Sequence, residues 1–352
     1  MLHFRKLIIC FLFLFLFCFS SWKSPSDTVI SKGQQPQITQ DNKGVLRVVF
    51  GRGDSIFCSM STDRGSLFLK PVLVGVVAQM HLGMARGPQL ASSAHYSVIT
   101  AMDKGGNIHY FMLNHQKGTW QNKGVVNDIN AIAPEGLMNI ANDGQDNFYA
   151  VWLDLRLNKR NNIFFSSLPS GERKWQKNKL IYRSPDEHVC ECCRPSIAVK
   201  GSNVAIMFRN WLNGSRDLYL ATSSNKGQTF NAAVKLGNGT WKMNACTMDG
   251  GGLNFNADNT INTTWQRQGA VYYCKPGEDE KELAKGRDCS ISTGQNQILV
   301  AMSDAGIIKY KNVRSNAETI VGKGSYLKTI ILPNNKVLCV WEEDNMIKTK
   351  KI

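Results

Sequence analysis

The sequence predicts an all-β protein folded as a β-propeller of four-stranded blades, seven in number, with six as the alternative. Three observations lead to this prediction. The composition, 43% hydrophobic and 20% charged, is that of a folded chain rather than a disordered one. Short runs of β-forming residues dominate the sequence, with almost no helical periodicity. These runs recur in units of roughly 40 to 50 residues, the repeat length of a propeller blade.

The repeat is clearest in the second strand of each unit, which follows a turn rich in Asn, Asp or Gly. These strands are expected at residues 45–50, 97–101, 147–152, 204–208, 260–265, 297–301 and 336–341. Aligning them places the starts of the units near Pro36, Gly87, Pro134, Arg194, Cys246, Cys289 and Tyr326. The unit from Cys289 to Gly324 is the least regular, and for that reason six blades remain the alternative.

The last unit, which begins at Tyr326, has strands for only three of its four positions. The segment Asp27 to Lys32, just before the first unit, is expected to supply the missing outer strand. Such a strand would close the ring and remove the exposed edges of an open array. Residues 21–352 are therefore interpreted as one propeller domain.

Residues 1–20 have the features of a signal peptide. Arg5 and Lys6 form a positive end, a 13-residue apolar run follows, and small residues near Ser20 suit cleavage. Because a membrane span needs about 20 apolar residues, no transmembrane segment is expected in the mature chain. The protein is therefore expected to be exported, to the periplasm, the medium or the cell surface. A lipid anchor on Cys18 is the less favoured alternative, since the bulky Phe17 precedes it.

The charge balance favours an anionic partner. The chain has 42 Lys and Arg against 27 Asp and Glu, a formal net charge of +15. No nucleic-acid-binding motif accompanies this charge, and the lysines are scattered apart from a short run at residues 348–351. An acidic glycan or another anionic ligand is therefore the expected partner, nucleic acid is discounted, and no cofactor is predicted.

Four cysteines cluster at the starts of the fourth and fifth units: Cys190, Cys192, Cys193 and Cys246. In an exported protein a disulfide is the default interpretation. At least one of the first three is expected to bridge to Cys246, because adjacent blade starts would face each other. A thiolate site for zinc or a soft copper ion, with His188 nearby, is the alternative, and the favoured interpretation has no metal.

Two turns share the pattern S-x-(D/N)-x-G-x-x-F: Ser61 to Phe68 and Ser223 to Phe230. The carboxylate of Asp63 or the amide of Asn225 is expected to accept backbone N–H groups within the turn. The glycine allows a positive φ, and the aromatic residue is expected to pack into the blade. This pattern indicates a structural device rather than a ligand site.

With these turns, the chain resembles the sialidase-like β-propeller superfamily, whose repeats are called Asp boxes or BNR repeats. The resemblance covers the whole mature region. Further similarity lies in Phe208 to Asn210, in Cys246 to Gly251, and in Ser325-Tyr326 with Leu332 to Lys336, which follow the order of sialidase segments. The resemblance implies a propeller that binds a carboxylated glycan, or another anionic ligand, at the channel face.

The resemblance also implies roles for individual residues. Sialidases clamp the substrate carboxylate with three arginines, and Arg209 and Arg267 match two of them. The third would fall on Gln34, with Arg52 or Arg86 as substitutes in unexpected places. Tyr326 resembles the tyrosine nucleophile, Asp54 the acid, and Glu191 is the carboxylate closest to the expected base.

The missing clamp at Gln34 leaves two functions open. One is weak glycoside hydrolysis of the exo-sialidase type, with Tyr326, Asp54 and Glu191 as catalytic residues. The other is a non-catalytic binding or interaction scaffold, in which the cysteine cluster is structural or binds metal. In both, the substrate-binding candidates are Arg209, Arg267 and Arg52, together with three residues at consecutive unit starts, expected near the channel mouth: Arg194, Glu135 and Asp249.

Overall fold

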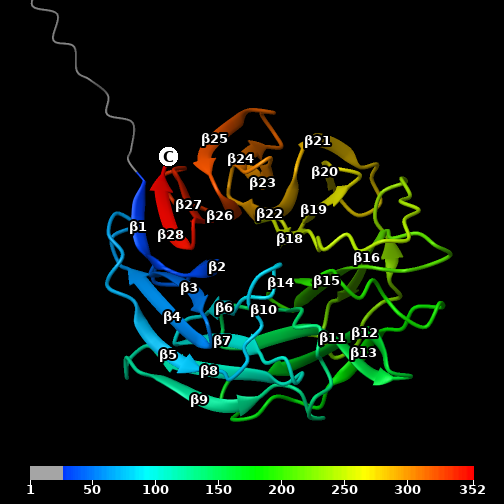
Figure 1. Ribbon diagram of the computed structural model, residues 1–352, viewed down its shortest axis with the longest axis horizontal. Coiled ribbons are helices and arrows are strands. Elements are labelled where there is room, and N and C mark those ends of the chain that lie inside the picture. Colours follow the sequence, from blue (N-terminus) through cyan, green and yellow to red (C-terminus); the bar gives the residue numbers. More distant parts are fainter. Residues whose placement is uncertain (1–26) are drawn as a thin grey trace, which may run out of the picture.

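The computed structural model describes residues 27–352, and all of their regular elements are β-strands. Twenty-eight strands form seven four-stranded antiparallel sheets arranged in a ring (Figure 1). The seven-blade prediction is confirmed, and the unit from Cys289 to Gly324 is a complete blade. The predicted signal peptide, residues 1–20, lies outside the described residues. Within residues 27–352, no helix is long and apolar enough to cross a membrane.

The blades follow one another along the chain. Blade 1 contains β2 (Gln34–Gln40), β3 (Leu46–Arg52), β4 (Ser55–Ser61) and β5 (Val72–Val76), and blade 2 contains β6 (Gln89–Ser92), β7 (Tyr96–Met102), β8 (Ile108–Asn114) and β9 (Trp120–Val125). Blade 3 contains β10 (Met138–Asn142), β11 (Phe148–Leu157), β12 (Arg160–Leu168) and β13 (Lys179–Tyr182), and blade 4 contains β14 (Ser196–Lys200), β15 (Asn203–Arg209), β16 (Leu218–Ser223) and β17 (Val234–Lys235). Blade 5 contains β18 (Gly252–Phe255), β19 (Ile261–Arg267), β20 (Ala270–Cys274) and β21 (Lys281–Lys285), and blade 6 contains β22 (Arg287–Thr293), β23 (Ile298–Asp304), β24 (Ile307–Asn312) and β25 (Glu318–Lys323). Blade 7 contains β26 (Ser325–Ile331), β27 (Val337–Glu343), β28 (Met346–Lys351) and β1 (Thr28–Lys32).

Blade 7 is completed from the other end of the chain, as the sequence predicts. Strand β1 pairs antiparallel with β28, with Thr28 opposite Thr349 and Lys32 opposite Met346. Figure 1 shows the two strands side by side, β1 in blue and β28 in red. The ring therefore has no open edge between its first and last blades.

The core lies between neighbouring blades, where apolar side chains from successive sheets interdigitate. Between blades 2 and 3, for example, Val98 and Trp152 are fully buried in one cluster with Tyr110 and Phe164. The second strands carry the largest share of these residues because the sheets bury both of their faces, so these strands read as continuous apolar runs. This explains why the second strands were the clearest part of the sequence repeat.

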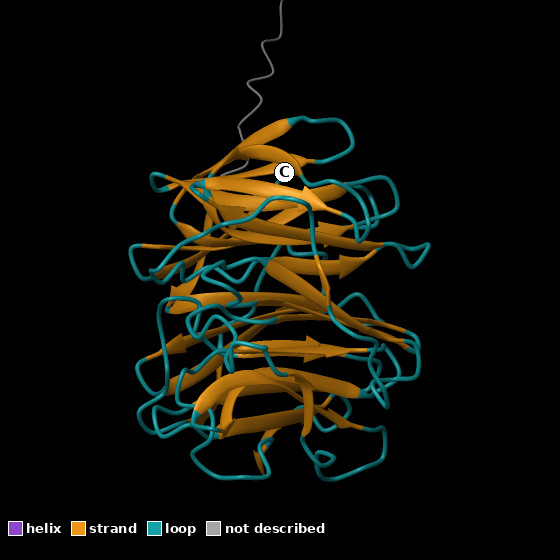
Figure 2. Cartoon of the chain, turned by 90° about the vertical axis from the view of Figure 1, so that its right-hand side faces the viewer, coloured by secondary structure: helices purple, strands orange, loops and turns teal. Residues whose placement is uncertain are grey.

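The two turns with the shared pattern use one hydrogen-bond scheme. Ser61 Oγ donates to Asp63 at 2.7 Å, and Asp63 Oδ1 accepts the backbone N–H groups of Ser66 and Leu67 at 2.9 and 3.0 Å. Asn225 does the same with Ser223 and Thr229 in blade 4. Both turns join the third and fourth strands of a blade, at the end opposite to the blade starts. Figure 2 shows the loops gathered at these two ends of the strands.

Candidate functional site

Three consecutive blades begin with the same irregularity at the channel. In blade 7 the pairing steps from Ser325 opposite Glu342 to Lys328 opposite Val340, so the inner strand has one residue more than its partner. The inner strands of blades 6 and 1 make the same step. Such a β-bulge redirects the side chain of the extra residue. The repetition in blades 6, 7 and 1 therefore points three side chains in a similar way.

The bulged residues are Gln35, Asp288 and Tyr326, and each has a positive φ, at 57°, 53° and 55°. All three line one small cavity at the blade starts. A non-glycine residue in this backbone region costs about 1–3 kcal/mol, and such conformations concentrate at functional sites. We therefore take this end of the channel as the candidate functional site.

Two cations from opposite sides of the ring face this cavity, Arg194 at the start of blade 4 and Lys328 in blade 7. Arg194 Nη1 donates to Gln89 Oε1 at 3.3 Å. Within residues 27–352, neither cation has a carboxylate oxygen within 4 Å. No ion pair with a described carboxylate therefore neutralises either charge.

The burial of this cluster changes its titration. Burial and, to a lesser extent, the positive charge of Arg194 lower the pKa of Lys328 to about 8. Burial also raises the pKa of Asp249, and the charge of Asp288 adds to the rise. One oxygen of Asp249 accepts the backbone N–H of Asp288 at 2.9 Å, which links the starts of blades 5 and 6.

Tyr326 lies beside two carboxylates that the sequence analysis did not single out. Burial raises the pKa of Tyr326, a hydrogen bond with the Gln35 side chain opposes the rise, and the charges of Asp288 and Glu342 add to it. Glu342 itself accepts the backbone N–H of Gln35 at 2.9 Å, and burial raises its pKa. Asp288 and Glu342 are therefore the carboxylates whose charges act on Tyr326.

A larger hollow of about 510 Å³ opens above this cavity toward solvent. Met248, Asp288 and Tyr326 line both spaces, whereas Arg287 lines only the larger hollow. The volume falls within the ~300–1,000 Å³ of small-molecule sites. A ligand of the size of one or two sugar rings in the hollow could thus contact Tyr326 and Asp288 and extend a charged group toward Arg194 and Lys328.

Arg209, an expected clamp residue, is buried and fully engaged with backbone carbonyls. Its side chain is 1% exposed. It donates to Arg216 O and Gln266 O, each at 2.8 Å, and to Asp249 O at 3.2 and 3.3 Å. Arg209 therefore holds the second strands and connections of blades 4 and 5 together and positions the segment that carries Asp249.

The other expected arginines also have partners within the protein. Arg267 forms an ion pair with Glu280 at 2.5 Å and stacks over the ring of Tyr272. Arg52 donates to the Ser31 hydroxyl at 2.8 Å and to the Lys32 carbonyl at 2.7 Å. The structure therefore does not bring Arg52, Arg209 and Arg267 together around one cavity, whereas it does bring Arg194, Asp249 and Tyr326 together.

The remaining candidates lie on the loops around the blade starts. One oxygen of Asp54 accepts the backbone N–H of Met80 at 3.1 Å. Glu135 lies 3.8 Å from Arg86, whose Nε also donates to the Glu135 carbonyl at 2.6 Å. Burial raises the pKa of Glu135, and the nearby charge of Glu191 adds to the rise against the effect of Arg86. The charge of Glu191 therefore acts on Glu135, whereas the carboxylate charges that act on Tyr326 are those of Asp288 and Glu342.

A disulfide joins Cys192 and Cys246. It links the connection before blade 4 to the connection before blade 5, as the sequence analysis expected for adjacent blade starts. Arg194 lies two residues after one cysteine and Asp249 three residues after the other, so the bridge fixes both loops beside the channel. His188, the nearest histidine in sequence, has its Nδ1 2.9 Å from the Val189 carbonyl and stacks on Trp211.

The site residues that sequence reasoning missed are Gln35, Asp288, Lys328 and Glu342. Their roles depend on the bulges, which no composition or motif reveals. One signal was present: a glycine stands two residues before each bulged residue, at Gly33, Gly286 and Gly324. Gly286 and Gly324 have φ of 152° and 135°, a region that favours glycine.

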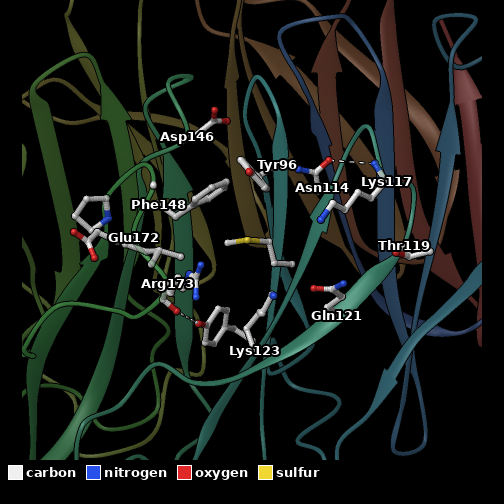
Figure 3. Close-up of a pocket in the computed structure, with 15 residues that line it drawn as sticks. Tyr96, Asn114, Lys117, Thr119, Gln121, Lys123, Asp146, Phe148, Glu172 and Arg173 are labelled. Carbon is white, nitrogen blue, oxygen red and sulfur yellow. Dashed lines mark hydrogen bonds between the residues drawn. The ribbon is translucent and has the colours of Figure 1, made fainter.

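A second pocket, of about 480 Å³, lies away from the channel, between blades 2 and 3 (Figure 3). Tyr96, Phe148 and Met112 form its apolar wall, and Figure 3 shows the cationic ends of Lys123 and Arg173 directed toward it. Lys117 lies at its rim. Among the described residues these three cations form no ion pair, while the Asp146 carboxylate is already bonded to His95 at 2.7 Å.

Several solved structures are similar to this chain. One is an ulvan lyase of a new polysaccharide lyase family, bound to -[GlcA(1-4)Rha3S]-; it is 9% identical, with a TM-score of 0.57 over 91% of this chain and 94% of that chain. AofleA from Arthrobotrys oligospora is also 9% identical, with a TM-score of 0.52 over 86% and 91%. NanB sialidase from Streptococcus pneumoniae is 11% identical, with a TM-score of 0.46 over 94% and 69%.

No family model matches the chain, and no curated protein matches it by sequence. At identities near 10% these structural similarities show the propeller fold alone. The function must therefore be argued from the residues of the site.

Proposed function

We propose that this protein is an exported propeller that binds a carboxylated sugar at the channel end formed by the bulged starts of blades 6, 7 and 1. The sugar ring would occupy the hollow beside Tyr326, with its carboxylate directed at Arg194 and Lys328. The ulvan lyase of the same fold binds a repeat that contains GlcA, a carboxylated sugar. That similarity supports the ligand class only at the level of the fold.

The observation that carries the proposal is a pair of cations, Arg194 and Lys328, for which the described part of the chain offers no carboxylate within ion-pair distance. Placing two positive charges in one half-buried cavity is unfavourable unless a counter-charge is bound. Asp249 and Asp288 supply part of it, but the raised pKa of Asp249 weakens its contribution. A ligand carboxylate would complete the charge balance, and its hydrogen bonds to charged donors are worth about 1.5–3 kcal/mol each.

Hydrolysis at this site, if it accompanies binding, is expected to be slow. Tyr326 would attack the sugar carbon as nucleophile, with Asp288 or Glu342 taking its proton and Asp249 donating a proton to the leaving group. Burial opposes the ionisation of Tyr326, and the adjacent negative charges oppose it further. The arrangement thus provides the required groups but holds the nucleophile in its less reactive form.

Titration calorimetry with N-acetylneuraminic acid, glucuronic acid and the neutral methyl ester of each tests the binding proposal. Lys328→Met and Arg194→Gln should each weaken binding of a free acid by roughly ten- to a hundredfold. Arg267→Gln, whose charge is paired with Glu280, is the matched control and should bind as the wild type does. Equal affinity for acid and ester, or no effect of Lys328→Met, would contradict the proposal.

The pocket between blades 2 and 3 favours a second candidate function, that of a non-catalytic glycan-binding scaffold. Aromatic rings suit the apolar faces of sugar rings, and three cations that form no ion pair with any residue of 27–352 suit an acidic group. Lys123→Ala combined with Arg173→Ala should then reduce retention on an acidic polysaccharide such as heparin, while Lys70→Ala on blade 1 should not. Unchanged retention of the double variant would dismiss this candidate.

A further inference from the structure

The cysteine cluster contains four cysteines, and its disulfide joins only two of them. Cys190 and Cys193 are free thiols that flank the bonded Cys192 in the same loop. The Sγ of Cys190 lies 3.7 Å from the Sγ of Cys192 and 3.4 Å from the Sγ of Cys193. A thiol in van der Waals contact with a disulfide sulfur is placed for exchange, because that reaction begins with attack of a thiolate on such a sulfur.

Cations surround Cys190 and favour its thiolate. Arg216 Nη1 donates to Cys190 Sγ at 2.9 Å. The hydrogen bond with Cys193 lowers the pKa of Cys190, and the charges of Arg209 and Arg216 lower it further, against the effect of burial. Burial raises the pKa of Cys193, and Thr247 Oγ1 lies 2.7 Å from its sulfur. Cys190 is therefore the thiolate of the pair, and Cys193 keeps its proton.

The two pairs differ in exposure. Cys190 and Cys193 are 0% and 2% exposed, whereas Cys192 is partly exposed and Cys246 lies at the surface. The other four free cysteines of residues 27–352 are buried, and burial raises the pKa of each: Cys58, Cys274, Cys289 and Cys339. The thiolate-favouring environment is therefore a property of this cluster and not of buried cysteines in general.

We propose that these four cysteines form a thiol–disulfide exchange site, which passes a disulfide between the surface pair Cys192–Cys246 and the buried pair Cys190–Cys193. In the first step the Cys190 thiolate attacks Cys192 Sγ, the Cys190–Cys192 bond forms, and Cys246 leaves as a thiolate. In the second step Cys193 attacks Cys190 Sγ, the Cys190–Cys193 bond forms, and Cys192 leaves as a thiolate. The proton of Cys193 passes to Cys246, so that atoms and electrons balance without an oxidant.

The exchange leaves a dithiol at the surface, where a small external disulfide can react with it. With oxidised glutathione, Cys246 and Cys192 would be joined again and two molecules of glutathione would be released. The net result is oxidation of a buried dithiol that the external disulfide does not contact. The chemical class of the co-substrate is thus a low-molecular-weight disulfide, and the site is independent of the sugar-binding proposal.

The folded protein is incubated with oxidised glutathione, quenched in acid, and its disulfides are mapped by mass spectrometry. We expect a Cys190–Cys193 disulfide beside Cys192–Cys246 and the release of two glutathione molecules per chain. Cys193→Ser should stop at a Cys190–Cys192 bond with glutathione on Cys246. Cys190→Ser should leave Cys192–Cys246 intact and Cys193 reduced, whereas the matched control Cys339→Ser should react as the wild type does.

Persistence of Cys190 and Cys193 as thiols in the wild type would overturn the proposal, and this measurement needs no variant to fold. Oxidation of Cys193 in Cys190→Ser at the wild-type rate would also overturn it. A stoichiometric zinc or copper ion in the purified protein would do the same, because a thiolate metal site would then account for the cluster.

Discussion

Arg194 and Lys328 approach one channel cavity from blades 4 and 7, and the charge of Arg194 helps to lower the pKa of Lys328. Two cations that line one cavity repel each other when no anion is bound. Asp249 and Asp288 moderate this repulsion, yet within residues 27–352 no carboxylate lies within ion-pair distance of either cation. The free protein therefore holds electrostatic energy that an acidic ligand would release, and four predictions follow from the geometry around it and from the ring itself.

Binding of a carboxylated sugar should weaken as pH rises above about 8. Lys328 has a pKa of about 8 in the free protein, so it is charged below that pH and loses its proton above it. Affinity should fall by up to tenfold per pH unit, until the pH reaches the higher pKa that a bound carboxylate gives to Lys328. Calorimetry between pH 6.5 and 9.5 measures this profile. Lys328→Arg, which keeps its charge, should flatten it, and a wild-type profile that is already flat would contradict the role of Lys328.

Tyr326→Phe should separate binding from hydrolysis. The substitution keeps the aromatic ring and the bulge but removes the hydroxyl that would act as nucleophile. We expect affinity for the acid within about threefold of the wild type, since a single neutral hydrogen bond contributes ~0.5–1.5 kcal/mol at most. Any turnover of a fluorogenic sialoside should fall to background. Turnover that survives in Tyr326→Phe would show that another group is the nucleophile.

Arg209→Met should destabilise the fold rather than act on a ligand. The substitution leaves three backbone carbonyls, those of Arg216, Asp249 and Gln266, without their charged donor. The free energy of unfolding should decrease by at least about 3 kcal/mol, measured by urea denaturation. Arg314→Gln, on an exposed part of blade 6, should change it by less than ~0.5 kcal/mol. A stable Arg209→Met protein with impaired sugar binding would instead support the clamp role that the resemblance implies.

The closing strand offers a matched pair of substitutions. Ile30 packs against the core cluster of blades 1 and 7, whereas the neighbouring Val29 is 49% exposed. Ile30→Asp should lower the free energy of unfolding by about 2–4 kcal/mol, because a carboxylate would be buried without a partner. Val29→Asp should have an effect below ~1 kcal/mol. Equal effects in thermal denaturation would mean that β1 contributes through its backbone pairing alone.

Much of the fold could be predicted from the sequence because its determinants are local. Apolar second strands and the turns before them recur at a fixed spacing, so the blade starts were found within a few residues of β2, β6 and β26. The outer strand β1 was predicted because blade 7 lacked a fourth strand of its own. Contacts between distant segments were harder to predict. Arg209 and Arg267 stand where the resemblance places clamp residues, but their partners, backbone carbonyls and Glu280, come from other parts of the chain.

The site itself depended on backbone conformation that residue types do not reveal. Asp288 and Gln35 reach the cavity because each is the extra residue of a bulge with positive φ. From the sequence pattern alone, Asp288 and Gln35 would be assigned to regular strand positions. Lys328 would be read as one polar residue in a strand that alternates polar and apolar residues. Only the register of β2, β22 and β26 against their neighbours shows that these side chains share one space.

The pairing of β1 with β28 also sets an order of events during biosynthesis. Thr28 leaves the ribosome long before Thr349 does, yet the two residues are opposite each other in the closed ring. Six blades can form as the chain emerges, whereas the seventh must wait for the C-terminal strands. Until then β1 has no partner, and contacts of such long sequence separation form slowly. A chain interrupted before β28 would therefore remain an open array, so ring closure distinguishes chains that contain all seven blades from shorter fragments.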